Sequence, residues 1–86
     1  MSIIFTRNAW KDYLLWQKVD RKMIIMINEL IKEIQRTPFE GKGKPEPLRF
    51  DMAGLWSRCI DRKHRLVYQV IDNEIIIYSC RYHYQK

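Results

Sequence analysis

The strongest constraint on the fold is a pair of strand-like stretches near the C-terminus, separated by only two residues. Residues 65–71 form one stretch, and an apolar, β-branched run begins at Glu74. Asp72 and Asn73 lie between them, and both residue types tolerate the positive φ that a two-residue hairpin turn requires. The pattern therefore predicts an antiparallel β-hairpin, against which the remaining elements must pack.

Two amphipathic helices are predicted before the hairpin. The first covers residues 8–18, with Thr6 as its N-cap, and its stripe of helical spacing consists of Trp10, Tyr13, Leu14 and Gln17. We expect this largely aromatic stripe to pack into the core, with Trp16 partly off it.

The second helix is longer and follows Asp20, another N-cap candidate. Its apolar stripe consists of Met23, Ile27, Leu30, Ile31 and Ile34. Pro38 disfavours helical geometry at the preceding Thr37, so the helix should end there. Ile24 and Met26 widen the apolar surface, which suits either a helix packed between layers or one that binds a partner chain or a second copy of this chain.

The remaining elements complete an α+β fold. Residues 2–5 and 56–60 are short strand candidates. The loop over residues 40–48 contains two glycines and two prolines, which argue against regular structure. We predict a single domain over residues 1–86, with two N-terminal helices packed on one face of a mostly antiparallel sheet of about four to five strands.

Composition narrows the possible functions. The net charge is +6, which suits a polyanion such as nucleic acid but can also serve solubility alone. Cys59 and Cys80 are too few and too far apart for a disulfide framework or a zinc site, so we expect two buried free thiols. No apolar run is long enough for a signal peptide or a membrane span, so we predict a cytoplasmic protein without a membrane partner.

Strand alternation divides the C-terminal run into two faces. One face carries Ile75, Ile77, Ser79, Arg81 and His83, and the other carries Ile76, Tyr78, Cys80, Tyr82 and Tyr84. We expect the second face to lie under the helices and the first to open into a cleft. The hairpin should also place Arg65 level with residues 80–82, with its guanidinium in reach of Arg81 or His83 and an anion between them.

A carboxylate, an imidazole and several guanidinium groups form a candidate set for phosphate chemistry without a metal or cofactor. Glu46 is the candidate base, and His83, whose ordinary pKa lies nearest neutrality, is the candidate acid. Arg65 supplies forked donors for phosphate oxygens, with Arg81 and Arg58 as further candidates. The set fits RNA cleavage by the substrate's own 2′-hydroxyl. Glu46 can equally be a solvated loop charge, and His83 a surface or hydrogen-bonded structural residue.

Two prolines constrain the backbone around the candidate base. Pro45 and Pro47 fix their own φ angles and bias the preceding residues, Lys44 and Glu46, toward extended geometry. We therefore expect Glu46 to be pre-organised. His64 falls in a predicted turn, and we assign it no role.

Four segments stand out as a set: residues 37–48 (TPFEGKGKPEPL), 54–58 (GLWSR), 64–68 (HRLVY) and 80–84 (CRYHY). Together they closely resemble the YoeB/Txe family of bacterial toxins, within the RelE-like group of toxin–antitoxin systems. The resemblance implies a microbial-ribonuclease-like (RelE-like) fold and an mRNA endoribonuclease that acts in the A site of the 70S ribosome. It also implies a cognate YefM/Axe-like antitoxin, through which alone the protein would contact operator DNA.

The resemblance also implies roles for individual residues. The family's general base, phosphate-stabilising arginine, general acid and neighbouring tyrosine match Glu46, Arg65, His83 and Tyr84. The basic residues that we predict to contact RNA or phosphate are Lys44, Arg49, Arg58 and Arg81. Because alternation separates Tyr84 from His83, a catalytic Tyr84 requires the strand to end or twist after His83.

Two other functions fit the same chain. A ParE-like inhibitor of the same general fold would bind DNA gyrase without catalysis and would not need Glu46, Arg65 and His83. A basic RNA-binding module would use its aromatic residues as stacking platforms and leave the RNA strand intact. The sequence specifies neither a codon preference nor whether the free protein is a monomer or a homodimer.

Overall fold

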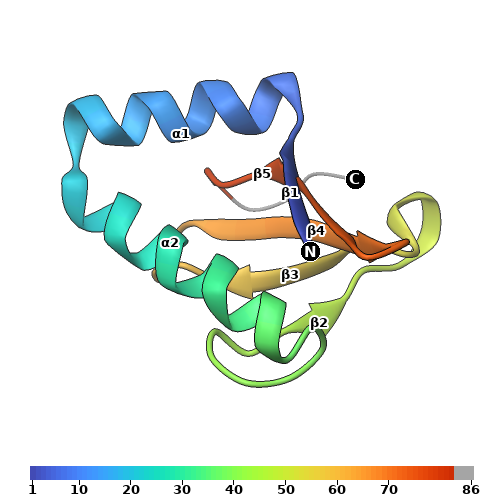
Figure 1. The fold of residues 1–86 in the computed structure, drawn as a ribbon. Coiled ribbons are helices and arrows are strands. Elements are labelled where there is room, and N and C mark those ends of the chain that lie inside the picture. Colours follow the sequence, from blue (N-terminus) through green and yellow to red (C-terminus); the bar gives the residue numbers. More distant parts are fainter. Residues whose placement is uncertain (83–86) are drawn as a thin grey trace.

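The computed structural model of the chain describes residues 1–82, which form two helices and a five-stranded sheet (Figure 1). The elements, in chain order, are β1 (Ser2–Phe5), α1 (Arg7–Val19), α2 (Arg21–Arg36), β2 (Glu46–Pro47), a 3₁₀ turn (Phe50–Met52), β3 (Trp56–Cys59), β4 (Arg65–Ile71) and β5 (Glu74–Ser79). The strand order is β1-β5-β4-β3-β2, and only the β1–β5 pair is parallel. Both helices share one core with the sheet, which confirms the predicted α+β architecture.

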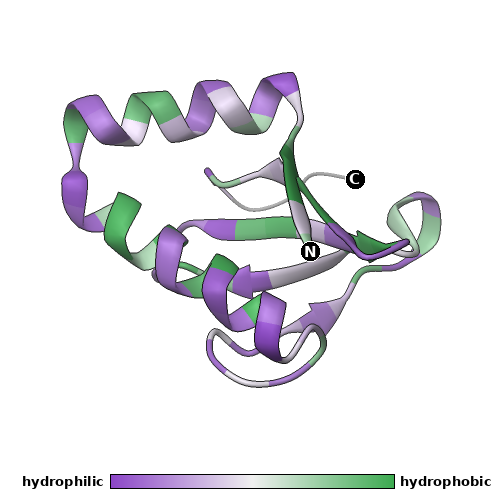
Figure 2. Ribbon diagram, in the orientation of Figure 1, coloured by the Kyte–Doolittle hydropathy of each residue, from purple (hydrophilic) through white to green (hydrophobic). Residues whose placement is uncertain are grey.

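Side-chain caps start both helices at the predicted residues. The Thr6 hydroxyl accepts a hydrogen bond from the Ala9 amide, and the Asp20 carboxylate accepts one from the Lys22 amide. The predicted stripe of α2 is buried at every position, namely Met23, Ile27, Leu30, Ile31 and Ile34. Hydrophobic and hydrophilic residues alternate along α2 with its turns, as Figure 2 shows. Within residues 1–82, neither helix is long and apolar enough to cross a membrane.

The core-facing side of α1 differs from the predicted aromatic stripe, because its buried positions are Ala9, Asp12 and Trp16. Trp10 and Leu14 are instead 47% and 45% exposed. The rings of Trp10 and Tyr13 stack with centroids 5.8 Å apart, and both contact Phe5 at the end of β1. The prediction was right for Tyr13, which packs against the core, and wrong for Trp10 and Leu14. Trp10 stacks on Tyr13 beside the edge strand, while a small residue, Ala9, is buried in the core.

The hairpin between β4 and β5 forms as predicted. Asp72 and Asn73 have φ angles of 50° and 62°, the positive values that a two-residue type I′ turn requires at both positions. β5 also pairs with β1 on its other side, so it is a central strand with neighbours on both edges. This position explains the continuous β-branched run with which β5 begins.

A β-bulge interrupts the hairpin and changes the predicted alternation. Tyr68 pairs with Ile77, but the preceding residue of β4, Val67, pairs with Ser79. Tyr78 is therefore an additional residue in β5, and the side chains beyond it are shifted by one position. An alternation rule applied across this point gives the wrong face for one half of the strand.

The burial of β5 shows which half was assigned wrongly. Ile75 and Ile77 are fully buried in the core shared with the helices, whereas Ile76 is half-buried. The prediction that Ile76 and Tyr78 lie under the helices was therefore wrong. Cys80, beyond the bulge, does belong to that core, as predicted.

The proline-rich loop contains a short strand, β2, that the sequence did not predict. Glu46 pairs with Ser57 and Pro47 with Trp56, at a sheet edge where a proline without an amide proton is tolerated. The expectation of extended geometry was wrong for Lys44, which has a φ of 52°. Glu46 is extended, as expected, because it lies within β2.

Truncation of single isoleucines in β5 tests the assignment of its faces. We expect Ile77→Ala to lower the free energy of unfolding by about 2–5 kcal/mol, because it opens a cavity in the shared core. Ile76→Ala should cost clearly less, since that side chain is half-buried on the opposite face. Urea unfolding of both variants measures the difference, and a larger loss for Ile76→Ala would contradict the structure.

Candidate active site

A carboxylate and a guanidinium meet on the sheet face opposite the helices. The pairing of β2 with β3, and of β3 with β4, places Glu46 beside Ser57 and Cys59 beside Arg65, so the four side chains share this face. Arg65 donates hydrogen bonds from Nε to Ser57 Oγ at 3.0 Å and from Nη1 to Cys59 Sγ at 3.3 Å. Its Nη2 donates to Glu46 Oε1 at 3.2 Å. The two residues predicted as base and charge stabiliser are thus brought together.

The surroundings of this pair suit anion binding. The Arg65 side chain is only 13% exposed and is held by three contacts, whereas the Glu46 side chain is 55% exposed. A guanidinium has more N–H donors than these contacts use, so it can still donate to an incoming phosphate. The arrangement combines a fixed cation with a carboxylate that solvent and substrate can reach.

Arg65 lies level with residues 80–82 of the C-terminal segment, as predicted. Its amide donates to the Tyr82 carbonyl at 3.0 Å. Its guanidinium contacts β2 and β3, however, whereas Arg81 donates to the Tyr82 hydroxyl at 2.7 Å and lies 4.5 Å from that ring's centroid. In the described part of the chain, the charged partner of the Arg65 guanidinium is therefore Glu46. The prediction had instead placed an anion between Arg65 and Arg81 or His83.

The predicted acid and its neighbouring tyrosine, His83 and Tyr84, lie outside the described residues, and their roles stay predictions. β5 ends at Ser79, and Tyr82 has a φ of 60°. Strand alternation therefore does not extend through Tyr82. The argument that alternation separates Tyr84 from His83 loses its basis for this reason.

Three side chains that the sequence analysis missed hold the segment after β5. Asp12 accepts a hydrogen bond from the Cys80 amide at 3.0 Å, and Trp16 Nε1 donates to the Cys80 carbonyl at 2.8 Å. His64 Nδ1 accepts from the Tyr82 amide at 2.7 Å. Asp12 and His64 are each 9% exposed, and burial raises the pKa of the Asp12 carboxyl. The signal available in the sequence was Asp12 itself, a carboxylate one helical turn before Trp16 that could accept a backbone hydrogen bond.

Arg58 does not fulfil its predicted role as an RNA contact, because its side chain is fully buried. It pairs with Leu66 and therefore lies on the helix side of the sheet. Its Nε donates to the Tyr68 hydroxyl at 3.0 Å. Its terminal nitrogens donate at 2.6, 3.0 and 2.9 Å to the carbonyls of Thr37, Glu40 and Lys42. Arg58 is a structural cation between β3 and the loop after α2, and the prediction of a phosphate contact was wrong.

Gly43 allows this loop to lie directly against β3. Its φ is 89°, and an added Cβ would come within 3.0 Å of both Arg58 Cβ and Leu30 Cδ2. Its carbonyl accepts a hydrogen bond from the Cys59 amide at 2.7 Å. Only glycine combines this backbone angle with this close approach. The loop is thereby attached to β3 shortly before the chain reaches Glu46.

The other predicted RNA contacts remain predictions. Lys44 and Arg49 are exposed and lie in the chain shortly before and after β2, so their charges can add to the potential near Glu46. Arg81 is half-buried and packed on Tyr82.

The two cysteines differ in their surroundings. Cys80 is buried, and this burial, together with the nearby negative charge of Asp12, raises the pKa of its thiol to about 12. Cys59 is half-buried beside Arg65, so the prediction of a buried thiol was right for Cys80 and wrong for Cys59. Within residues 1–82, no three His, Cys, Asp or Glu side chains are grouped in a way that could hold a metal ion.

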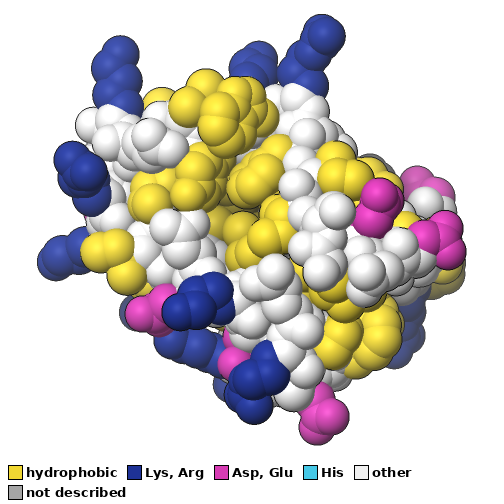
Figure 3. Space-filling model, viewed as in Figure 1, with side chains coloured by type: hydrophobic (Ala, Val, Ile, Leu, Met, Phe, Trp, Pro, Cys, Tyr) yellow, Lys and Arg dark blue, Asp and Glu magenta, His cyan; other side chains and the backbone are white. Residues whose placement is uncertain are grey.

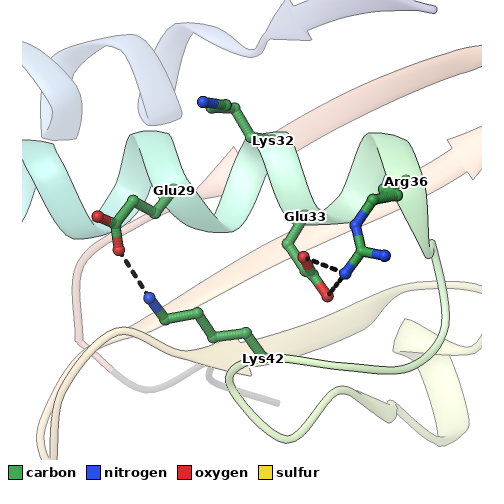
Figure 4. A pocket seen from close by; sticks show the side chains of 5 residues that line it. All are labelled: Glu29, Lys32, Glu33, Arg36 and Lys42. Atoms are coloured by element: carbon green, nitrogen blue, oxygen red, sulfur yellow. Dashed lines mark hydrogen bonds and ion pairs between the residues drawn. The ribbon is translucent and has the colours of Figure 1, made fainter.

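A pocket beside α2 is lined by charged side chains (Figure 4), namely Glu29, Lys32, Glu33, Arg36 and Lys42. Lys42 Nζ lies 2.6 Å from Glu29 Oε1, and Arg36 Nη2 lies 3.0 Å from Glu33 Oε1. These hydrogen bonds lower the pKa of both carboxyl groups. The ion pair between Lys42 and Glu29 joins the loop after α2 to that helix. This loop precedes Glu46 in the chain.

An apolar groove opens between α1, α2 and β1, on the face shown in Figure 3. Its walls include Phe5, Tyr13 and Ile31, and Ile3 and the neighbouring Ile4 are each 40% exposed. β1 is the last strand on this side of the sheet. Exposed apolar side chains beside an edge strand are typical of a surface that binds another chain.

Two helices on one face of this sheet, with a carboxylate–arginine pair on the other, define a protein of the RelE-like toxin fold. The RelBE2 toxin–antitoxin complex from Mycobacterium tuberculosis, 22% identical with a TM-score of 0.72, shares that fold. The family itself is shown by sequence: residues 5–84 match the family described as YoeB-like toxin of bacterial type II toxin–antitoxin system, and the chain belongs to that family.

Individual relatives agree with this assignment. Toxin YoeB of Escherichia coli K12 is 55% identical over 84 residues, which cover 98% of this chain and the whole relative. The YoeB/ParE toxin from Agrobacterium tumefaciens is 48% identical with a TM-score of 0.95, over 98% of this chain and all of that one. The Staphylococcus aureus YoeB dimer and YoeB–YefM complex are 49% and 48% identical, with TM-scores of 0.92 and 0.91, and each match covers 98% of both chains.

Replacement of Arg58 tests its structural role. We expect Arg58→Met to lower the free energy of unfolding by about 3 kcal/mol or more, because several buried carbonyls lose their donor. Arg49→Met, at an exposed position, should change stability by no more than ~0.5 kcal/mol. Chemical denaturation measures both values. Equal stability of the two variants would contradict a structural role for Arg58.

Proposed function

We propose that this chain is a ribosome-dependent mRNA endoribonuclease, the toxin of a type II toxin–antitoxin pair that inhibits translation. The observation that carries the proposal is the contact of Glu46 with Arg65, 3.2 Å between Oε1 and Nη2, in a chain with a net charge of +6. The pair supplies a base and an oriented cation on a sheet face along which a polyanionic strand can bind. Membership of the YoeB-like toxin family supports the proposal.

The proposed reaction is an attack by the ribose 2′-hydroxyl on the adjacent phosphorus. Glu46 removes the hydroxyl proton, and Arg65 stabilises the negative charge that builds on the non-bridging phosphate oxygens. The bond from phosphorus to the 5′-oxygen breaks, and His83 donates a proton to that leaving oxygen. The products are a 2′,3′-cyclic phosphate and a 5′-hydroxyl, and none of the proposed steps uses a metal or a cofactor.

The geometry of Arg65 explains how the pair can accept a phosphate. When the phosphate binds, Arg65 can exchange its contact with Glu46 for one with a phosphate oxygen, while Ser57 and Cys59 keep the guanidinium in place. The exchange costs little, because the Glu46 side chain is 55% exposed and water screens its attraction to the cation. It also frees the carboxylate to accept the 2′-hydroxyl proton.

Further residues complete the proposed site. Lys44, Arg49 and Arg81 contribute positive charge for the RNA backbone, which steers and positions the strand. Tyr84 lies next to the acid in sequence and is proposed to orient either His83 or a base of the mRNA.

The proposed partners are the mRNA in the A site of the ribosome and a YefM-like antitoxin, in the cytoplasm. The antitoxin is supported by the YoeB–YefM complex of Staphylococcus aureus, and a homodimer by the YoeB dimer from the same organism. The exposed apolar groove beside β1 supports the proposal that this chain associates with another chain.

Substitutions of the proposed acid and base test the mechanism. We expect Glu46→Gln and His83→Ala each to lower the single-turnover rate of mRNA cleavage by about 10²–10⁴-fold, because each removes one proton-transfer group. Arg7→Ala, an exposed arginine at the start of α1, is the matched control and should retain the wild-type rate. Toeprinting on programmed ribosomes gives the rates, and equal rates for all three variants would refute the assignment.

The chemistry of the product ends separates the proposal from its alternatives. We expect 2′,3′-cyclic phosphate ends on cleaved mRNA and no effect on DNA supercoiling by gyrase. Inhibition of gyrase without mRNA cleavage would identify a ParE-like inhibitor instead. Binding to programmed ribosomes without strand scission would identify an RNA-binding module.

A further inference from the structure

The segment that leads to His83 is held by side chains from two separate parts of the chain. α1 supplies Asp12 and Trp16, which bond the amide and carbonyl of Cys80 at 3.0 and 2.8 Å. The turn before β4 supplies His64, whose Nδ1 accepts the Tyr82 amide at 2.7 Å. The start of β4 then donates its Arg65 amide to the Tyr82 carbonyl at 3.0 Å. Both peptide groups that flank the Tyr82 Cα are therefore fixed.

His64 is itself held in one orientation. Its ring meets the Trp16 ring edge-on, with centroids 4.8 Å apart, and is only 9% exposed. Its backbone amide donates to Asp61 Oδ1 at 2.7 Å, and its carbonyl accepts from the Ile60 amide at 2.9 Å. Because a backbone amide can only donate, Nδ1 must be unprotonated and the ring hydrogen must lie on Nε2.

The backbone of Tyr82 needs a hydrogen-bond partner from elsewhere in the chain to hold its conformation. Its φ of 60° lies in the left-handed region, which a bulky residue adopts only when its surroundings impose it. Its side chain is 47% exposed, and its ring contacts Arg81, Lys63 and the His64 ring, whose centroid lies 5.6 Å away, so burial does not impose the angle. The hydrogen bonds to its amide and carbonyl are the contacts that can hold this backbone conformation.

We propose that His64 is a positioning residue for the reaction: through Nδ1 it holds the backbone of Tyr82, the residue directly before the proposed acid, in this turn. The inference rests on the proposed function, in which His83 is the acid. In this proposal His64 acts through the Tyr82 backbone and does not contact the substrate. A general acid must lie within hydrogen-bond reach of the leaving oxygen, and a displacement of about 1 Å can lower a rate by ~10²-fold.

A matched pair of substitutions separates positioning from packing. His64→Asn keeps an acceptor, because its Oδ1 is attached to Cγ as Nδ1 is in histidine, but it loses the ring that packs on Trp16. His64→Phe keeps a ring against Trp16 and loses the acceptor. We expect His64→Phe to lower the single-turnover cleavage rate at saturating ribosomes by about tenfold or more, and His64→Asn to stay within about threefold of wild type.

The stability of the two variants should not follow the order of their activities, whereas a merely structural role would make activity follow stability. We expect His64→Phe to melt at the same temperature as His64→Asn or higher, because the ring packing is retained. Amide hydrogen exchange at Tyr82 should speed up in His64→Phe and remain slow in His64→Asn. If His64→Phe does not fold, His64→Leu removes the acceptor with a smaller change in volume and serves in its place.

The outcomes also separate this inference from the proposed function. Wild-type cleavage with an equally active His64→Phe, or with activities that follow stability, would overturn the positioning role. Unchanged exchange of the Tyr82 amide in His64→Phe would overturn it as well. If the wild type cleaves no mRNA at all, the proposed function fails, and the Tyr82 exchange rates still decide whether His64 holds this turn.

Discussion

The buried guanidinium of Arg58 is the interaction on which the rest of the structure depends. A fully buried cation is costly unless its donors are matched, and here the Tyr68 hydroxyl and the carbonyls of the loop after α2 lie within 3.0 Å of its nitrogens. Each hydrogen bond to a charged group contributes about 1.5–3 kcal/mol. Burial raises the pKa of Tyr68, so its hydroxyl stays protonated and donates to the Pro38 carbonyl at 2.8 Å. A loop rich in glycine and proline is thereby fixed to β3.

This attachment determines where the candidate base lies. The Gly43 carbonyl is bonded to the Cys59 amide, so the chain enters β2 already aligned along β3 and places Glu46 opposite Ser57. Ser57 and Cys59, on this same outer face of β3, then hold Arg65 through their side chains. β3 therefore supports both arginines: Arg58 on its inner face organises the loop, and Arg65 lies against its outer face beside the carboxylate that the loop delivers.

The features that were predictable from sequence depend on local chemistry. The stripe of α2 follows from periodicity alone, and the hairpin follows from two residues that tolerate a positive φ. The buried face of α1 was not predictable in this way, because Trp10 is as apolar as a core residue. Its orientation depends on Asp12, which bonds a backbone amide 68 positions away in the chain. The burial of the Arg58 side chain likewise depends on strand register. Arg58 pairs with the buried Leu66, whereas Cys59 pairs with Arg65 on the outer face.

The β-bulge shows why the candidate site could be predicted only in part. Glu46 and Arg65 were found from residue type and hairpin geometry, but their contact depends on β2, a strand too short to leave a periodic pattern. Beyond Tyr78, one additional residue turns Cys80 toward α1, where Asp12 and Trp16 bind its backbone. Without the bulge, the alternation that buries Ile77 would point Cys80 away from α1. Because of the bulge, β5 packs Ile75 and Ile77 into the core and also places Cys80, just after its end, where Asp12 and Trp16 bond its backbone.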